Sequence, residues 1–200
     1  MLKSVYQNGG FYIGKYETGI ENKPKTSYSV DTAPTETPVI KRNAYPYNYV
    51  TCSQAQTLAS NMESGNHTSS LMFGVQWDLV LKYLETKGTS QVDLKTDSTS
   101  WGNYTNNAWN ITNSNSKYAI YDDKLKNFDW TSGAYGIKDS DTMVLLSTGA
   151  SDDFSKQGIY DLAGNVSEFT LEHANLISRA LVTCPCAVRG GIYYTYDDAA

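Results

Sequence analysis

Apolar residues recur at helical spacing in two segments of the first half of the chain. The first segment spans residues 52–62, and its apolar side chains fall at positions i, i+3, i+4 and i+7 of one face: Ala55, Leu58, Ala59 and Met62. Thr51 precedes this segment and Gln54 follows three residues later, which is the pattern of a capping box. We therefore predict an amphipathic helix over residues 52–62, ending before Gly65.

The second segment spans residues 75–87 and shows the same spacing. Its buried face is expected to consist of Trp77, Val80, Leu81 and Leu84. Gly88 follows directly, and glycine is common just after a helix because it adopts the left-handed conformation without strain. The pattern thus predicts two helices.

The segments that resemble strands are short. Residues 11–17 are rich in aromatic and β-branched side chains and follow a glycine pair, which is typical of a strand. Residues 143–146 read Met-Val-Leu-Leu and predict a short buried strand, and residues 180–188 predict another strand or hairpin. Residues 21–46 are rich in Pro, Thr and Lys without periodicity, which indicates a surface loop.

Residues 93–153 show little regularity. Asn, Ser, Thr, Asp and Gly dominate this segment, and aromatic residues are spaced along it: Trp101, Tyr104, Trp109, Tyr118, Tyr121, Phe128, Trp130 and Tyr135. A disordered linker lacks such aromatic anchors. We therefore expect a long packed loop of the kind that often carries function.

Length and charge restrict the class of protein. A chain of 200 residues can form one domain, which we place at residues 1–200, without help from a metal or disulfide. The net charge is −5 and no basic cluster is present, which argues against nucleic acid and anionic membranes as partners. The first residues lack the apolar run of a secretory signal, and no apolar stretch is long enough for membrane insertion.

The residues that most often carry catalysis form no motif. Cys184 and Cys186 are too close for an easy disulfide, and with Cys52 they give no zinc-site spacing. We expect these thiols to be mostly buried or unreactive. His67 and His173 lie in polar surroundings, so surface or hydrogen-bonding roles are expected for both.

Two motifs in the second half of the chain carry a family resemblance. Residues 158–170 read Gly-Ile-Tyr-Asp-Leu-Ala-Gly-Asn-Val-Ser-Glu-Phe-Thr, and residues 189–191 read Arg-Gly-Gly. In this order they resemble the formylglycine-generating enzymes, also called sulfatase-modifying factors. Weaker similarity at residues 10–17, 49–62 and 73–78 extends the resemblance over most of the chain.

The resemblance implies a C-type-lectin-like α+β fold, in which two helices flank small twisted antiparallel sheets and much of the chain is irregular loop. In the enzymes, two cysteines shortly after the Arg-Gly-Gly motif bind copper, since Cu(I) prefers thiolate ligands. Residues 192–200 contain no cysteine, and the family's Trp-Glu-Trp is replaced by Ser167, Glu168 and Phe169. We therefore expect no copper and no oxidase activity. The family's closing Gly-Phe-Arg strand is also expected to be missing.

A calcium site is the cofactor that the resemblance suggests. Asn165, the carbonyl of Val166 and Glu168 match positions that resemble a calcium site in the family. Oxygen ligands at a glycine-rich turn suit a hard cation. The alternative is that Asn165 and Glu168 satisfy backbone groups in a tight turn.

Tyrosine is used 16 times, and several tyrosines follow the Arg-Gly-Gly motif. The candidate ligand-binding residues in this last segment are Tyr193, Tyr194, Tyr196, Asp197 and Asp198. Tyrosine offers a large amphipathic contact area with few rotatable bonds, so binding surfaces favour it. The segment resembles the variable region of proteins from diversity-generating retroelements, which share the lectin-like scaffold. A plain edge strand is the alternative.

The leading hypothesis is a non-catalytic recognition module, such as a receptor-binding protein of a phage tail or bacterial surface. It would bind a protein or glycan on a cell surface through the C-terminal tyrosines and residues 93–153, beside other virion or surface subunits. Its location would be a phage virion or the bacterial cell surface, or the cytoplasm if neither applies. Two alternatives stay open: a divergent enzyme of the formylglycine-generating family, and a structural virion or surface domain without a ligand.

Overall fold

The computed structural model describes residues 6–7, 9–62, 65–122, 127–172 and 186–196. Its helices are α2 (Cys52–Ser60), α3 (Gly74–Thr86) and α4 (Gln91–Lys95), with a 3-10 turn at Asp152–Phe154. Its strands are β1 (Gly19–Ile20), β2 (Tyr45–Pro46), β3 (Trp109–Ile111), β4 (Lys117–Asp122), β5 (Asn127–Ser132), β6 (Gly136–Lys138), β7 (Val144–Leu146), β8 (Ser155–Lys156), β9 (Ile159–Tyr160), β10 (Glu168–Thr170) and β11 (Ala187–Arg189).

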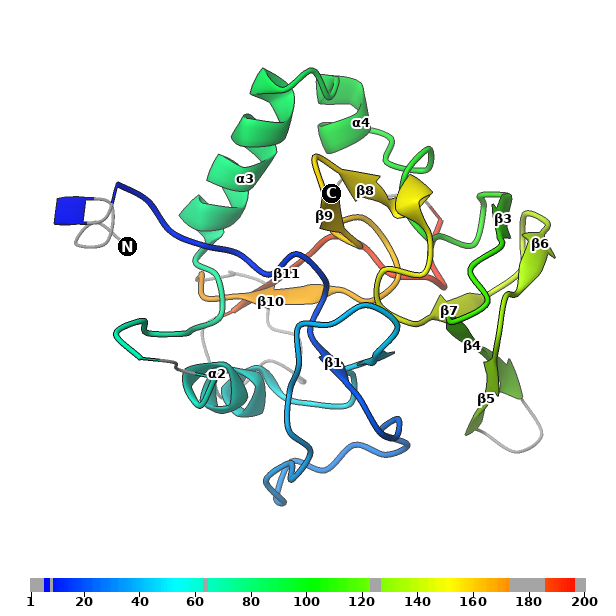
Figure 1. Ribbon diagram of the computed structural model, residues 1–200, viewed down its shortest axis with the longest axis horizontal. Helices are drawn as coiled ribbons and strands as arrows, with labels where there is room; N and C mark the ends of the chain where they lie inside the picture. Colours follow the sequence, from blue (N-terminus) through cyan, green and yellow to red (C-terminus); the bar gives the residue numbers. More distant parts are fainter. Residues whose placement is uncertain (1–5, 8, 63–64, 123–126, 173–185, 197–200) are drawn as a thin grey trace.

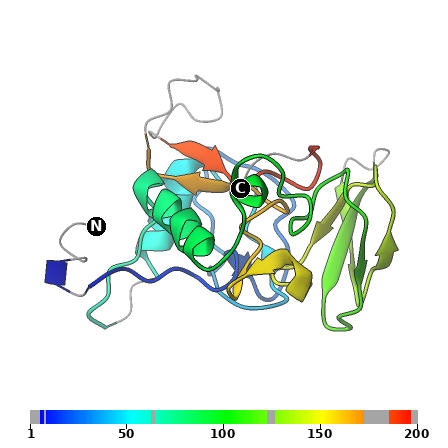
Figure 2. The ribbon, with the colours of Figure 1, turned by 90° about the horizontal axis from the view of Figure 1, so that it is seen from above.

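The strands form several small antiparallel sheets. The largest has three strands in the order β5-β4-β7, and the others are the pairs β1–β2, β3–β6, β8–β9 and β10–β11. The sheets built from β3 to β7 make up one end of the molecule, while α2 and α3 lie at the other end with β10 and β11 (Figures 1 and 2). This confirms the predicted α+β class with small sheets and much loop, although the described residues contain three helices rather than two.

Both predicted helices are confirmed. Thr51 and Gln54 form the capping box of α2: Thr51 Oγ1 accepts from the Gln54 backbone N–H at 3.1 Å, and Gln54 Oε1 accepts from that of Thr51 at 2.9 Å. Trp77, Val80 and Leu84 are buried on α3, as their spacing predicts. The missed helix, α4, has only five residues and buries one of them, so no periodicity could reveal it.

The predicted strand at residues 11–17 is wrong. The described chain forms no strand there, and its first strand is β1. Phe11 and Ile13 instead pack against the largest core cluster, and the carbonyl of Lys15 accepts a hydrogen bond from the Tyr160 backbone at 3.0 Å. The aromatic content of the segment reflects contact with the core rather than pairing in a sheet.

The prediction of one long loop at residues 93–153 is also wrong, because this segment contains the end of α4 and all of β3 to β7. The short strand expected at residues 143–146 is confirmed by β7. Polar residues in β3 are held by pairing with β6, and those in β5 by pairing with the preceding strand β4, and such pairing overrides local propensity. Of the strand expected at residues 180–188, β11 covers the end, and residues 180–185 lie outside the described chain.

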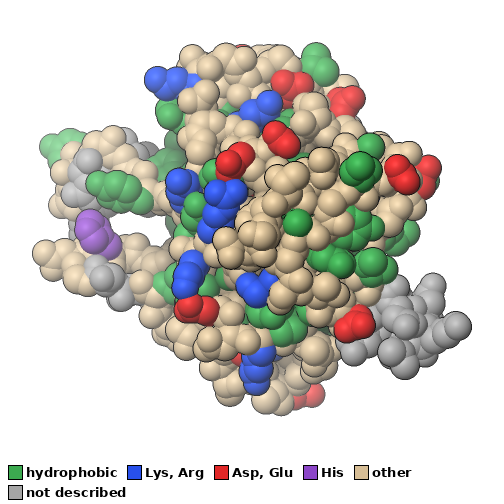
Figure 3. All heavy atoms as spheres, turned by 45° about the vertical axis from the view of Figure 1, so that its right-hand side comes forward, with side chains coloured by type: hydrophobic (Ala, Val, Ile, Leu, Met, Phe, Trp, Pro, Cys, Tyr) green, Lys and Arg blue, Asp and Glu red, His purple; other side chains and the backbone are tan. Residues whose placement is uncertain are grey.

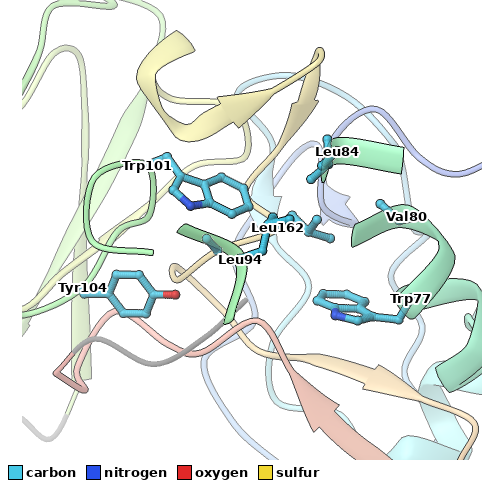
Figure 4. Packing of buried hydrophobic residues seen from close by; sticks show 8 residues of the cluster. Trp77, Val80, Leu84, Leu94, Trp101, Tyr104 and Leu162 are labelled. Atoms are coloured by element: carbon cyan, nitrogen blue, oxygen red, sulfur yellow. The ribbon is translucent and has the colours of Figure 1, made fainter. Parts of the chain in front are cut away.

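The largest core cluster joins the helices to the turn after β9. Figure 4 shows its side chains, which come from α3, α4 and two loops: Trp77, Val80, Leu84, Leu94, Trp101, Tyr104, Leu162 and Ala163. Two smaller clusters lie among the strands, one around Val144 and Leu146 and one around Ala119, Leu145 and Tyr193. The turn after β9 and the segment after β11 are thus both anchored in the core.

The surface carries charges of both signs. Figure 3 shows one face, where Lys and Arg side chains stand among Asp and Glu side chains rather than in a continuous basic patch. In the described part of the chain, every helix is too short or too polar to cross a membrane.

Candidate functional site

The segment after β11 turns tightly and presents two of its three tyrosines to solvent. Residues 192–196, called the tyrosine turn below, form a turn rather than an edge strand. Tyr194 is 50% exposed and Tyr196 is 66% exposed, whereas Tyr193 is buried at 8%. Asp197 and Asp198, the other predicted ligand-binding residues, lie outside the described residues.

Buried hydrogen bonds fix the backbone of the tyrosine turn. Thr105, itself buried, donates from its backbone N–H to the Thr195 carbonyl at 3.0 Å and from Oγ1 to the Tyr193 carbonyl at 3.1 Å. The Tyr193 N–H donates to the Asn165 carbonyl at 3.0 Å. Because these partners are distant in sequence, the turn is held by the fold as a whole. Tyr194 and Tyr196 therefore project from a fixed backbone.

Tyr193 is expected to act as the anchor of this turn. It packs with Ala119 and Leu145, and its ring meets the Phe128 ring edge-on at 6.0 Å. Tyr193→Ala is expected to lower the free energy of unfolding by about 3 kcal/mol through lost burial and the cavity left behind. Tyr194→Ala should stay within about 0.5 kcal/mol of the parent. Urea denaturation measures both, and equal losses would contradict the buried position of Tyr193.

Asn165 connects the turn after β9 to β7. Its Oδ1 accepts from the Leu146 N–H at 3.0 Å and from Asn103 Nδ2 at 3.1 Å. Its Nδ2 donates to Glu17 Oε2 at 2.9 Å and to the Leu146 carbonyl at 3.2 Å. Both donors and both acceptor positions of the amide are thus used by protein partners. Asn165 thus satisfies backbone groups. This is the role expected of it under the alternative to a calcium site.

The two motifs that carry the family resemblance meet at their glycines. The Gly164 N–H donates to the Gly190 carbonyl at 2.6 Å. Gly164 has φ of 69°, and a Cβ atom there would lie 2.4 Å from the Asn103 carbonyl oxygen. Gly190 has φ of 85°, and a Cβ there would lie 2.3 Å from Glu168 Oε2. Both positions therefore require glycine.

Three carboxyl groups gather behind this turn. Burial raises the pKa of Glu17 well above its usual value, and the charge of Asp161 raises it further, while the hydrogen bond from Asn165 opposes the shift. Burial also raises the pKa of Glu168 well above its usual value, with further contributions from the charges of Glu17 and Asp161. The three groups therefore repel one another when ionised.

Asp161 is the most enclosed of the three, with 2% of its surface exposed. Burial raises its pKa to about 7, although a hydrogen bond from the Gly149 N–H at 2.5 Å and the charge of Arg42 oppose the shift. The Arg42 guanidinium also bonds the Gly149 carbonyl at 2.8 Å, so it lies close to this aspartate without pairing with it directly. The cluster thus keeps a proton near neutral pH.

A cavity of about 470 Å³ borders two of these carboxyls. Its lining comes from several segments: 12–18, 38–40, 47–62, 69–72, 159–162 and 166–169, with Trp77 of α3 and Ile192. Four buried side-chain atoms of the described residues have no hydrogen-bond partner: Glu17 Oε1, Asn48 Oδ1, Trp77 Nε1 and Glu168 Oε2. All four belong to residues that line this cavity. As whole residues, Glu17 and Glu168 are half-buried because they border the cavity. Their unpartnered atoms, Glu17 Oε1 and Glu168 Oε2, nevertheless have essentially no accessible surface.

The predicted calcium ligands lie together, but their geometry does not favour the ion. Within the described ranges, no group of three or more His, Cys, Asp or Glu side chains is placed to hold a metal. Asn165 Oδ1 already accepts two hydrogen bonds, from the Leu146 N–H and from Asn103 Nδ2. Calcium would have to displace these hydrogen bonds to bind Asn165 Oδ1, so calcium binding stays a prediction.

Cysteine and histidine contribute little to the described site. Cys52 and Cys186 are both 2% exposed, in line with the expected buried thiols. Cys184 and His173 lie outside the described residues. His67 is exposed and meets the ring of Tyr12 edge-on at 6.1 Å.

No local pattern in the sequence groups Glu17 with Asn48 and Trp77, or with Asp161. Glu17 ends the aromatic segment 11–17, the spacing of Trp77 indicates only a helix face, and Asp161 is one residue of the motif at 158–170. The one sequence signal for this site is Glu17, an acidic residue at the end of an aromatic segment. Only the fold brings Glu17 to Asn165, which lies 148 residues later.

Comparison with known proteins leaves the function to be argued from the site, because no protein-family model, curated protein or solved structure matches this chain. The resemblance to the formylglycine-generating family accordingly stays a prediction from the quoted motifs. The function is inferred below from the tyrosine turn.

Proposed function

We propose that this chain is a non-catalytic recognition module on a C-type-lectin-like scaffold, which binds a protein or glycan of a cell surface through the tyrosine turn. The observation that carries the proposal is the contrast within the turn: Tyr194 and Tyr196 are exposed, while the backbone between them is fixed by buried bonds to Thr105. Pre-organised aromatic side chains lose little entropy on binding, so such a turn suits recognition.

Contacts between the two family-like motifs support the proposed scaffold. The Gly164 N–H bonds the Gly190 carbonyl, and Ser167 Oγ donates to the Gly191 carbonyl at 2.8 Å. The motif residues thus hold the start of the tyrosine turn in place. Their role in this chain is structural, which is what a binding domain on the same scaffold requires.

A binding role also agrees with the residues that follow the Arg-Gly-Gly motif. Residues 192–200 contain no cysteine, so the copper-binding pair of the oxidases has no counterpart there. Tyr194 and Tyr196 occupy this region instead, as in the variable proteins of diversity-generating retroelements. The proposal therefore includes a location on a phage virion or bacterial surface and excludes the oxidase reaction.

The proposal is tested by a screen of the purified chain against a panel of bacterial strains and a glycan array. The double variant Tyr194→Ala/Tyr196→Ala is expected to lose about 2 kcal/mol or more of binding free energy, about 30-fold in affinity, because central tyrosines are typical hot spots. The matched control is Tyr28→Ala/Tyr83→Ala, which removes two tyrosines that are each 46% exposed elsewhere on the surface. Loss in both variants alike, or in neither, would contradict recognition through this turn.

A further inference from the structure

Lys138 is a buried cation at the end of β6. It is 1% exposed, and within the described part of the chain no carboxylate forms an ion pair with it. Its ammonium group donates to three backbone carbonyls, those of Tyr104 at 3.0 Å, Thr105 at 3.1 Å and Asn107 at 2.5 Å. The ammonium nitrogen also lies 5.5 Å from the centre of the Trp109 ring. All three N–H donors of the side chain are thus used.

The buried charge of Lys138 costs free energy of folding. Taking an ammonium group out of water is unfavourable, and apolar residues of similar volume often replace buried charges without loss of stability. Here the charge meets carbonyl dipoles and an aromatic ring rather than a carboxylate. The three carbonyls belong to one short segment, residues 104–107, which lies outside any helix or strand. The ammonium group therefore ties an irregular segment to β6.

The segment 104–107 carries contacts that fix the tyrosine turn. Thr105 donates to two carbonyls of the turn, from its backbone N–H at 3.0 Å and from Oγ1 at 3.1 Å. Tyr104 Oη donates at 3.1 Å to the carbonyl of Gly190, shortly before the turn. The donors of these two residues therefore hold the turn, while their carbonyls are held by Lys138.

The other hydrogen bonds of this segment each reach a single backbone group. Asn107 Oδ1 accepts from the Tyr104 N–H at 3.1 Å, which is a bond within the segment. From outside, the Asp141 N–H donates to the Thr105 carbonyl at 2.7 Å. The ammonium group of Lys138, in contrast, joins three carbonyls at one point, so its loss should affect the whole segment.

We propose that Lys138 is a positioning residue of the tyrosine turn: its ammonium group holds the segment 104–107, and this segment fixes the backbone from which Tyr194 and Tyr196 project. The inference rests on the proposed function where it concerns affinity, whereas the order of the turn can be measured without a ligand. A neutral amine has two N–H donors, so loss of the proton leaves one of the three carbonyls without its ammonium partner and loosens the segment.

The charge state of Lys138 thereby makes the turn sensitive to pH. Burial lowers the pKa of Lys138 to about 8, and the charge of Asp141 opposes the shift. The other titratable groups of the segments beside it are Tyr104, Tyr135 and Asp139. Because the folded chain binds this proton less tightly than the unfolded chain does, the contribution of Lys138 to stability rises from pH 8 to about pH 10. A turn that loosens at pH 9 is therefore distinct from unfolding.

The test measures the order of the tyrosine turn from ¹³C relaxation of the Cα positions of residues 193–196, which amide exchange at high pH does not disturb. The parent is expected to show order parameters of about 0.85 at pH 7, as for rigid backbone, and lower values at pH 9. Lys138→Met is expected to show values of about 0.6 or below at both pH values. Methionine has a similar volume and brings no buried charge, so the variant should fold, which its melting temperature verifies.

Lys117→Met is the matched control. Lys117 also donates to a backbone carbonyl, that of Asn43, and its ammonium nitrogen lies 4.9 Å from the centre of the Tyr45 ring. Burial lowers the pKa of Lys117 as well. This control should keep the order and the pH response of the parent. A parent turn equally ordered at pH 7 and pH 9, a folded Lys138→Met as ordered as the parent, or equal loosening by Lys117→Met would each overturn the proposal.

Affinity separates this proposal from the proposed function. For a strain or glycan that the screen identifies, Lys138→Met is expected to bind about tenfold more weakly than the parent although it keeps Tyr194 and Tyr196, because a loosened turn must be ordered on binding. A turn that loosens without loss of affinity would support the role of Lys138 and contradict recognition through the turn. Weaker binding by a turn that stays as ordered as in the parent would overturn the role of Lys138.

Discussion

Asn165→Ala is expected to lower the free energy of unfolding by about 4 kcal/mol, the largest effect expected of a substitution in this chain. The change removes the four hydrogen bonds of the amide and leaves the Leu146 N–H and carbonyl without their side-chain partner. A buried group that loses its partner costs about 1–3 kcal/mol. Asn165 also has φ of 63°, where alanine adds strain of about 1 kcal/mol.

Urea denaturation followed by tryptophan fluorescence measures this loss. The matched control is Asn110→Ala, which removes an exposed asparagine of β3 and is expected to stay within about 0.5 kcal/mol of the parent. Asn165→Gly should be less destabilising than Asn165→Ala, because glycine removes the backbone strain but not the lost hydrogen bonds. A small effect of both Asn165 variants would show that the amide does not hold the turn to β7.

The second large effect concerns pH: the protein is expected to be more stable near pH 5 than near pH 8. Burial raises the pKa of Glu17, Asp161 and Glu168 in the folded chain, that of Asp161 to about 7. The folded state therefore binds more protons than the unfolded state between the usual carboxyl pKa and the raised one. The stability from these protons is complete below pH 4 and is lost as the pH rises through the raised values.

For Asp161 alone, a pKa of about 7 in place of 3.8 corresponds to a loss of at most about 4 kcal/mol across this range. The measurement is the melting temperature at pH 5, 6, 7 and 8. Asp161→Asn should flatten the profile, because it removes one of the three titrations. A melting temperature that rises steadily from pH 5 to pH 8 would show that these carboxyls are ionised and compensated in the folded protein.

The helices could be predicted from sequence because their signals are local. The capping box of Thr51 and Gln54 and the spacing of Trp77, Val80 and Leu84 depend on residues within a few turns of one another. Most strands could not, because β4, for example, pairs with β5 and β7 in ways that polar composition does not reveal; the exception is β7, which is a short apolar run. Ala119 in β4 is completely buried while its neighbour Ile120 is 46% exposed, yet the surrounding residues mask that alternation.

The candidate sites likewise contain one part that could be predicted from sequence and one part that could not. Exposed tyrosines after the Arg-Gly-Gly motif could be predicted from residue type, but the burial of Tyr193 depends on Phe128 and Ala119, far away in sequence. The cavity could not be predicted at all, because Glu17 meets Asn165 only through the fold. Local pattern indicates which residues suit binding, and long-range packing decides which of them remain accessible.

The central claim is that a fixed backbone presents Tyr194 and Tyr196 to a partner. The most direct measurement is the affinity of the parent, Tyr194→Ala/Tyr196→Ala and Tyr28→Ala/Tyr83→Ala for each bacterial strain or glycan that the screen identifies, with folding of each verified by its melting temperature. The account predicts that the first variant loses about 30-fold in affinity while the second binds like the parent. Undiminished binding by a folded Tyr194→Ala/Tyr196→Ala variant would contradict it.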